Sequence, residues 1–279
     1  AGPAGIAAAL AAAAAGLRVA IVDEARQTGG QYFRGRQQSR EEGAPHMLAA
    51  ATGAVEVLTD TVVVDTPAPG TISIWRNGDP HAQDLAWDRL VIATGAYDRA
   101  VALPGWTLPG VMGAGGASTL AKVHGVTPGR RVLVSGSGPF LLAAADDLSA
   151  HGSSVEVLDA ARWSASARGL PAIARDPEIA AQAAGYLVRL ARRGIRRRYG
   201  EMVTAILGET RVTAAVVHAV DEDWRPIAGS RRVVEADAVV LGFGFVPQLE
   251  LAQALGCALQ RSRRDAGYVV CVDDAMRTT

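Results

Sequence analysis

Two glycine-rich turns, each followed about twenty residues later by an acidic side chain, are the best candidates for binding chemistry in this sequence. In such a motif, glycines let the backbone approach a diphosphate, the next helix donates N–H groups to it, and the acid accepts the ribose hydroxyls. We therefore expect two nucleotide sites. The first motif comprises Gly2, Pro3, Ala4, Gly5, Asp23 and Glu24, and the second comprises Gly136, Gly138, Pro139 and Asp159.

The two motifs belong to an internal repeat. Laying the sequence over itself with a shift of about 136 residues aligns several identical pairs. They include Gly2 with Gly138, Pro3 with Pro139, Gly16 with Gly152, Val19 with Val155, Asp23 with Asp159 and Arg26 with Arg162. The second copy starts with an apolar strand at 131–135, so we expect a strand and a glycine ahead of the first copy too. Alanine-rich runs after the proline of each turn predict helices, because proline is tolerated in the first helical turn.

Each half then continues as a β-meander and a strand that ends in small residues. In the first half these are 55–65, 71–79 with an Asn77-Gly78 hairpin signal, and 88–95. In the second half they are 211–220, 231–236 and 237–244. We predict an α/β fold of two Rossmann-like dinucleotide-binding domains, one inserted in the other. The expected domains are 1–104 with 242–279, and 105–241, with crossings near 104–116 and 242–247.

The second motif departs from the usual pattern, since Leu141 stands where a third glycine is expected. A larger side chain there should hold the helix further from the strand. Asp159 disfavours a 2′-phosphate, so NAD is favoured over NADP at this site. The alternative is a vestigial site that folds and binds nothing.

Composition excludes several classes of function. The chain has 28 basic and 28 acidic residues, so no global charge favours nucleic acid. Its longest apolar run, 6–15, is about half the length of a membrane span. The two cysteines form no CxxC, so no dithiol relay is expected, and a reducing cytoplasm is the predicted location. The arginine-rich run 189–198 is interpreted as a solvated helix end, with a partner surface as the alternative.

Four stretches together resemble a known family. They are TGGQYFR, ATGAYDRAVALPGWTLPGVM, SGSGPFLLAAADDLSAHG and GFGFVPQLELAQALGC. They are similar to the two-dinucleotide-domain flavoproteins, the pyridine nucleotide-disulfide oxidoreductase-like fold of thioredoxin and glutathione reductases. Within that fold they resemble the α (A-type) subunits of opine oxidase, hydroxyproline dehydrogenase and hydrogen cyanide synthase, and part of sarcosine oxidase α.

The resemblance implies FAD at the first site, with Gly30 and Gln31 contacting the cofactor and Thr94-Gly95 approaching it again. NAD or another adenine nucleotide would occupy the second site. It also implies an amine- or imino-acid-oxidising complex in which a second flavoprotein subunit often oxidises the substrate. Such proteins usually continue into a V-P-G…A-G-D segment whose aspartate binds the flavin, and this segment is expected beyond Thr279.

Three functions remain open from the sequence. The first is a flavin-dependent dehydrogenase subunit, in which hydride passes from a C–H next to nitrogen to the flavin. The second is an NADH-dependent flavoprotein reductase without a redox disulfide, and the third is a non-catalytic scaffold that holds nucleotide. No catalytic base is assigned. The candidates for contact with a substrate carboxylate are Tyr32, Arg34, Tyr97 and Arg99.

Overall fold

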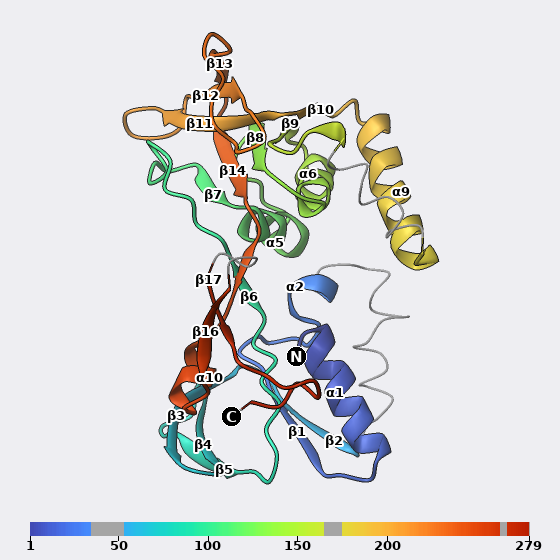
Figure 1. The fold of residues 1–279 in the computed structure, drawn as a ribbon. Coiled ribbons are helices and arrows are strands. Elements are labelled where there is room, and N and C mark those ends of the chain that lie inside the picture. Colours follow the sequence, from blue (N-terminus) through green and yellow to red (C-terminus); the bar gives the residue numbers. More distant parts are fainter. Residues whose placement is uncertain (35–52, 165–174, 263–266, 279) are drawn as a thin grey trace. The chain divides into compact units, whose positions relative to one another are not determined.

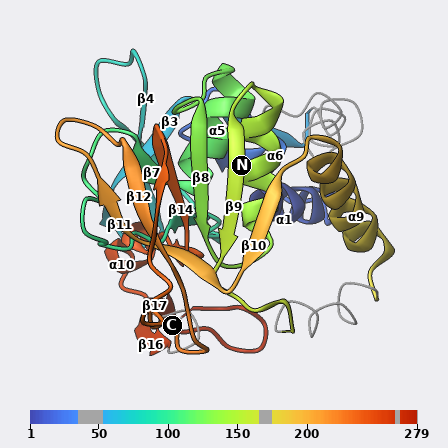
Figure 2. The ribbon, with the colours of Figure 1, turned by 90° about the horizontal axis from the view of Figure 1, so that it is seen from above.

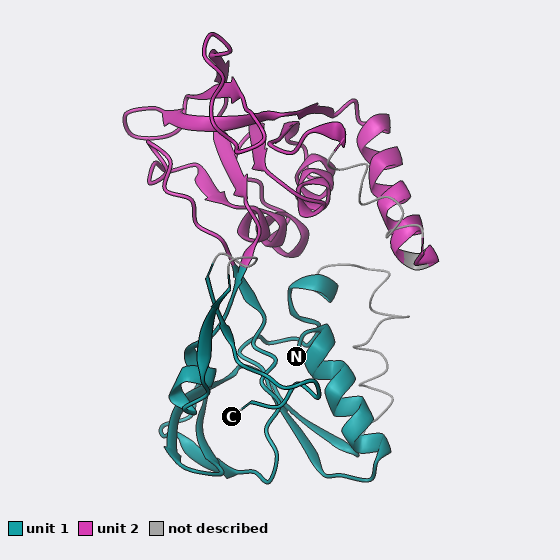
Figure 3. Cartoon of the chain, in the orientation of Figure 1, with its two compact units in different colours: residues 1–97, 246–279 teal, residues 98–245 magenta. Residues whose placement is uncertain are grey.

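The computed structural model describes residues 1–34, 53–164, 175–262 and 267–278 (Figure 1). The chain divides into two compact units, Ala1–Tyr97 with Val246–Thr279, and Asp98–Phe245 (Figure 3). It passes between them in β6 (Ala96–Asp98) and β15 (Phe245–Pro247), which pair with each other. The described residues contain no helix with the length and apolar character needed to cross a bilayer.

Unit 2 is built on a five-stranded parallel sheet in the order β10-β9-β8-β14-β7 (Figure 2). Strand order and register place the ends of β8, β9 and β14 at one edge, with Gly136 opposite both Asp159 and Gly242. Ligands of open parallel sheets bind at this carboxyl edge. The strands are β7 (Val111–Gly113), β8 (Arg131–Gly136), β9 (Ser154–Asp159), β10 (Arg196–Tyr199) and β14 (Ala238–Gly242).

The two faces of this sheet are covered differently. Val132 and Val134 of β8 join the core under the helices, whereas Leu133 joins the core under the antiparallel meander, as the alternation of a strand requires. This explains why β8 is an almost continuous apolar run. The helices are α5 (Ala114–His124), α6 (Phe140–Ala150) and α9 (Pro177–Arg192), and the meander is β11 (Glu201–Leu207), β12 (Ala214–Ala219) and β13 (Arg232–Glu235).

Unit 1 repeats part of this plan. Helix α1 (Pro3–Ala14) leads into β1 (Val19–Val22), which pairs in parallel with β2 (Val55–Leu58), and Ile6, Ala9 and Ile21 form its small core. The predicted meander is present as β3 (Thr61–Ala68), β4 (Thr71–Arg76) and β5 (Gln83–Ala86). The remaining elements are α2 (Gly30–Phe33), α10 (Glu250–Ala254), β16 (Leu259–Ser262) and β17 (Gly267–Val270).

One predicted strand is wrong. Residues 88–95 form no strand, and Val91 is 67% exposed. A strand needs a hydrogen-bonded neighbour, and β14, the counterpart in unit 2, lies between β8 and β7. In the described part of unit 1, β1 pairs with β2 alone, so no described strand of that sheet is a neighbour for residues 88–95.

The expected domain limits remain a prediction, but packing assigns two short stretches differently. Residues 98–104 and 242–245 group with unit 2. Asp98 bonds to helix α5, and β14 continues in the sheet to Gly242. The chain therefore enters unit 2 before the proline-rich stretch in which the first crossing was expected.

Candidate nucleotide-binding sites

The first glycine turn, at Gly2, lies directly against the Gly29-Gly30 turn of the same unit. A Cβ built on Gly30 would lie 2.6 Å from the Gly2 Cα, and Gly30 has a φ of +57°, which disfavours a side chain. The Gly29 N–H also donates to the Ala1 carbonyl at 2.7 Å. Two separate segments thus bring bare backbone to the start of α1, whose N-cap Gly2 provides no side-chain cap.

Asp23 lies beside this pair of turns, directly after β1. Its backbone N–H donates to the Leu58 carbonyl at 2.9 Å, and its Oδ1 accepts from the Ala25 N–H at 2.8 Å. Its Oδ2 contacts the Ala1 nitrogen, which places the carboxylate next to the Gly2 turn. The neighbouring Glu24 is exposed, so Asp23 is the better placed of the two candidate acids.

The segment containing Thr94 and Gly95 also reaches the start of α1. A Cβ on Gly5 would make ordinary contact with the Ala93 Cβ at 3.5 Å. Gln248 holds the segment, because its N–H donates to the Gly95 carbonyl and its own carbonyl accepts from the Thr94 hydroxyl, both at 3.1 Å. Sequence reasoning did not single out Gln248, although it lies within the quoted stretch GFGFVPQLELAQALGC.

The residues gathered in unit 1 fit a dinucleotide such as FAD. The start of α1 carries backbone N–H groups and the positive end of the helix dipole, which suit a diphosphate. The close Gly2–Gly30 contact is a cradle that a Cβ would fill, and Asp23 suits a ribose. Gln31 is exposed on α2, directly after Gly30.

The second glycine turn is equally dependent on the absence of side chains. A Cβ on Gly136 would lie 1.9 Å from the Gly242 carbonyl oxygen, and Gly138 has a φ of +109°. Leu141 is buried at 1% exposure, and a Cβ on Gly242 would lie 2.6 Å from its Cδ2. Because Gly242 has no side chain, it leaves space for Leu141, which stands where a third glycine was expected. Gly242 lies about a hundred residues away in sequence, so the sequence did not predict this contact.

Asp159 is more enclosed than its counterpart Asp23. It is 1% exposed, its Oδ1 accepts from the Ala161 N–H at 3.0 Å, and its Oδ2 accepts from Arg197 Nη2 at 2.6 Å. Arg197 is thus an ion-pair partner at the position where a ribose was expected.

The arginine-rich run 189–198 was expected to be a solvated helix end, and the structure shows that it is more than that. It spans the end of α9 and all of β10. Arg189 and Arg193 pair with Asp146 at 2.8 and 2.5 Å, and Arg198 pairs with Glu156 at 2.7 Å. The interpretation holds for the end of α9, where the exposed Arg189 and Arg192 lie in the last turn, and not for β10. The acidic partners lie on other elements, for which sequence spacing gives no signal.

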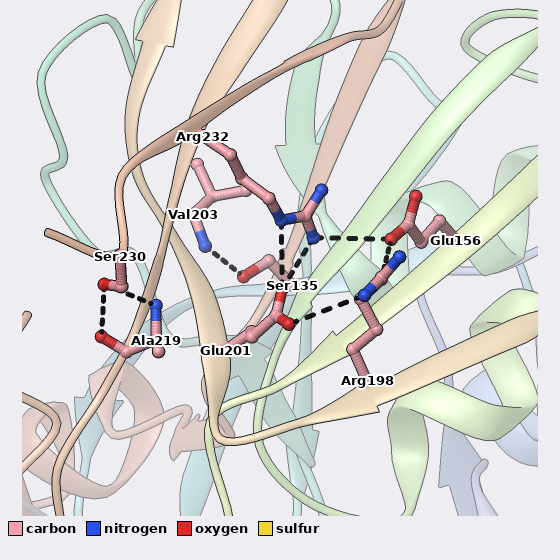
Figure 4. A network of polar contacts seen from close by, with 8 residues as sticks. All are labelled: Ser135, Glu156, Arg198, Glu201, Val203, Ala219, Ser230 and Arg232. Carbon is pink, nitrogen blue, oxygen red and sulfur yellow. Dashed lines mark hydrogen bonds and ion pairs between the residues drawn. The ribbon is translucent and has the colours of Figure 1, made fainter. Parts of the chain in front are cut away.

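Figure 4 shows the cluster that contains Arg198. Arg232 of β13 donates to Glu201 at 2.6 Å and lies 3.4 Å from Glu156, so β9, β10, β11 and β13 are tied together. Nearby, the buried Ser135 hydroxyl of β8 accepts from the Val203 N–H of β11 at 2.9 Å. These contacts attach the meander to the parallel sheet.

The four proposed carboxylate-contact residues divide between the units, with Arg99 in unit 2 and the other three in unit 1. Tyr32 is exposed and packs edge-on against Phe33. Tyr97 is half-exposed in unit 1, and loss of hydration, then Glu250, raises its pKa. The Arg99 guanidinium donates to the Phe245 carbonyl at 3.2 Å within unit 2. No substrate site follows from these positions.

Comparison with known proteins decides the family. The model of the pyridine nucleotide-disulphide oxidoreductase family matches residues 1–279. The chain belongs to this family. Membership confirms the predicted pair of Rossmann-like domains, the oxidoreductase class and FAD as cofactor.

The curated relatives of this family member include subunits of three kinds of enzyme. The chain is 32% identical to the hydrogen cyanide synthase subunit HcnB of Pseudomonas aeruginosa, over 96% of the chain and 60% of the relative. It is 31% identical to the A-type subunit of opine oxidase from Agrobacterium tumefaciens, over 100% and 58%. It is 28% identical to the alpha subunit of sarcosine oxidase from Corynebacterium sp., over 90% and 26%. The chain therefore spans at most about three fifths of these relatives.

Solved structures agree on the fold of this family member. Thioredoxin reductase of T. acidophilum superposes with a TM-score of 0.66 at 20% identity, covering 99% of this chain and 84% of that one. L-proline dehydrogenase of P. horikoshii gives 0.63 at 20% identity, covering 100% and 47%. At these identities the likeness shows the fold alone.

Proposed function

We propose that this chain is the FAD-binding part of one subunit in an oxidoreductase complex that acts on amino or imino acids. The relatives from opine oxidase and sarcosine oxidase support this, because opines and sarcosine both carry a C–H next to nitrogen. Both relatives are named as subunits, which supports a second subunit, proposed to be a flavoprotein. The location proposed for the complex is the cytoplasm.

The observation that carries the proposal is the backbone contact of Gly2 with Gly30, beside Asp23. Bound there, FAD supplies the acceptor for a hydride from a carbon next to nitrogen. The start of α1 binds the diphosphate, Asp23 accepts the ribose hydroxyls, and Thr94-Gly95 and Gln31 complete the contacts. The proposed first-site residues are Gly2, Pro3, Ala4, Gly5, Asp23, Glu24, Gly30, Gln31, Thr94 and Gly95.

A second candidate is an NADH-dependent flavoprotein reductase. The intact turn of Gly136 and Gly138 at the carboxyl edge of the unit 2 sheet favours it. The pairing of Asp159 with Arg197 weakens it, because that carboxylate is already engaged.

The test uses the full-length protein, alone and with its second subunit. We expect a flavin absorbance that sarcosine or an opine bleaches without oxygen only when the second subunit is present. Asp23→Asn should lose most of the flavin, whereas Glu56→Gln, at an exposed acid on β2 outside the proposed site, should keep it.

Other results overturn the proposal in recognisable ways. Rapid bleaching by NADH of the protein alone would replace it with the reductase. Flavin that no amine or dinucleotide bleaches would indicate a scaffold. Full-length protein that never retains flavin would reject the first site itself.

A further inference from the structure

The carboxyl edge of the unit 2 sheet holds an acidic residue that is not available to a ligand. Both Asp159 oxygens are engaged, one by the Ala161 N–H and one by Arg197 Nη2 at 2.6 Å, and the side chain is 1% exposed. Ribose hydroxyls would have to compete with Arg197 for the Asp159 oxygen that it engages. NAD binding through Asp159 would therefore leave a guanidinium without its partner in a largely buried place.

Arg197 is positioned by more than this ion pair. Strand register pairs Tyr199 of β10 with Asp159 of β9, and the Arg197 guanidinium lies 4.3 Å from the centre of the Tyr199 ring. Trp163 meets Tyr199 edge to face, with centroids 5.3 Å apart. Arginine both stacks on aromatic rings and binds phosphate through its planar set of donors, so a guanidinium held in this way suits a phosphate.

The charge at this place also differs from what the sequence suggested. Asp159 alone would repel a 2′-phosphate, but the pair with Arg197 is neutral overall. Arg197 Nη2 is the guanidinium atom bonded to Asp159, Nε is buried and makes no hydrogen bond within the described residues, and the side chain as a whole keeps 19% exposure. A guanidinium offers five N–H donors, so it can hold a carboxylate and a phosphate together.

We propose that Arg197 selects the nucleotide of the second site. It withholds Asp159 from the free ribose hydroxyls of NAD and offers its own guanidinium to the 2′-phosphate of NADP. This reverses the preference expected from Asp159 alone. The proposal rests on the second glycine turn being a working nucleotide site, and it does not depend on amine oxidation.

The test is calorimetric titration of full-length protein with NAD⁺ and with NADP⁺. We expect wild type to bind NADP⁺ more tightly by about tenfold, the value of one charge-assisted hydrogen bond. Arg197→Met keeps the stem on Tyr199 and removes the charge. This variant should bind NADP⁺ more weakly and NAD⁺ more tightly, so that the preference reverses.

The matched control is Arg198→Met, one residue along the same strand. Arg198 pairs with Glu156 at 2.7 Å and not with Asp159, so the NADP⁺ preference should remain. Asp159→Asn covers the case in which Arg197→Met fails to fold, and it should also keep the NADP⁺ preference.

Three results would overturn the proposal. They are a wild-type preference for NAD⁺, a binding ratio that Arg197→Met leaves unchanged, and no binding of either nucleotide by any variant. Flavin absorbance at the first site is recorded on each sample. A protein that retains flavin but fails here rejects this proposal alone, whereas loss of flavin from wild type rejects the proposed function.

Discussion

The Asp98 carboxylate accepts a hydrogen bond from the Gly115 N–H at 2.9 Å and so caps helix α5 from seventeen residues earlier in the chain. It also accepts from the Gly116 N–H at 3.1 Å. A Cβ on Gly113 would lie 2.3 Å from Asp98 Oδ2, so the glycine at the N-cap makes room for this carboxylate. The negative charge of Asp98 also interacts favourably with the positive end of the α5 helix dipole.

Replacing Asp98 by alanine should destabilise unit 2. The change removes the acceptor for two N–H groups at the start of α5, and we expect a loss of about 1–2 kcal/mol in the free energy of unfolding. Urea unfolding followed by circular dichroism measures it. Asp223→Ala is the control, since Asp223 makes an exposed ion pair with Arg225, 3.4 Å long, and a local backbone contact. Equal effects of the two variants would contradict the capping role.

Gly30→Ala should abolish flavin retention by the full-length protein. The added Cβ would lie 2.6 Å from the Gly2 Cα, and the backbone with φ +57° resists a side chain, so the two turns must separate. Flavin absorbance after gel filtration measures the effect.

Gly16→Ala is the matched control for Gly30→Ala. Gly16 also has a positive φ, +80°, but its Cβ would meet no atom within 4 Å. We expect it to cost about 1 kcal/mol of stability and to leave the flavin bound. Retention of flavin by Gly30→Ala would show that the contact of the two turns is not needed for binding.

Leu141→Ala should leave a cavity beside Gly242. Leu141 is fully buried at the start of α6, so the free energy of unfolding should fall by about 2–5 kcal/mol. Leu187→Ala on α9 is the control, because Leu187 is 51% exposed and should change stability by about 0.5 kcal/mol or less. Both are measured by urea unfolding, and similar losses would mean that Leu141 is not the packing residue that Gly242 accommodates.

Asp237 should titrate below its ordinary pKa. The Arg131 N–H at 2.9 Å is the main cause, with the Arg131 charge and the Arg130 N–H also lowering the pKa. Because folding lowers this pKa, the group stabilises the folded state at neutral pH. That contribution is lost as pH falls below about 3.8 toward the folded pKa.

Carboxyl chemical shifts followed through an acid titration test this origin. Arg131→Met removes the side-chain charge but keeps the backbone N–H. The pKa of Asp237 should therefore rise and still stay below its ordinary value. A complete return to the ordinary value would assign the shift to the guanidinium instead.

Local patterns predicted the elements, and long-range contacts decided the sites. The glycine turns and both meanders follow from short spacings, as Pro3 and the Asn77-Gly78 turn illustrate. The partners of Asp159, Leu141 and Asp98 are Arg197, Gly242 and Gly115, which lie on other elements. Sequence spacing carries no signal for such pairs, because tertiary packing brings them together.

The strand expected at 88–95 is wrong although its local signal is strong. Its residue types, Leu90 to Ile92 followed by small residues, favour a strand, but pairing needs a neighbour on the same sheet. Strand propensity shows that a segment can adopt extended backbone, but a strand forms only where a neighbouring strand completes its backbone hydrogen bonds.

The pairing of β6 with β15 brings the two ends of unit 2 together. The chain enters and leaves unit 2 at neighbouring positions, because the Arg99 N–H donates to the Gly244 carbonyl at 2.9 Å. A unit whose two ends meet can enter or leave a host chain without rethreading either one. Unit 1 is therefore interrupted between Tyr97 and Val246 only in sequence, since the paired strands β6 and β15 carry the chain across at neighbouring positions.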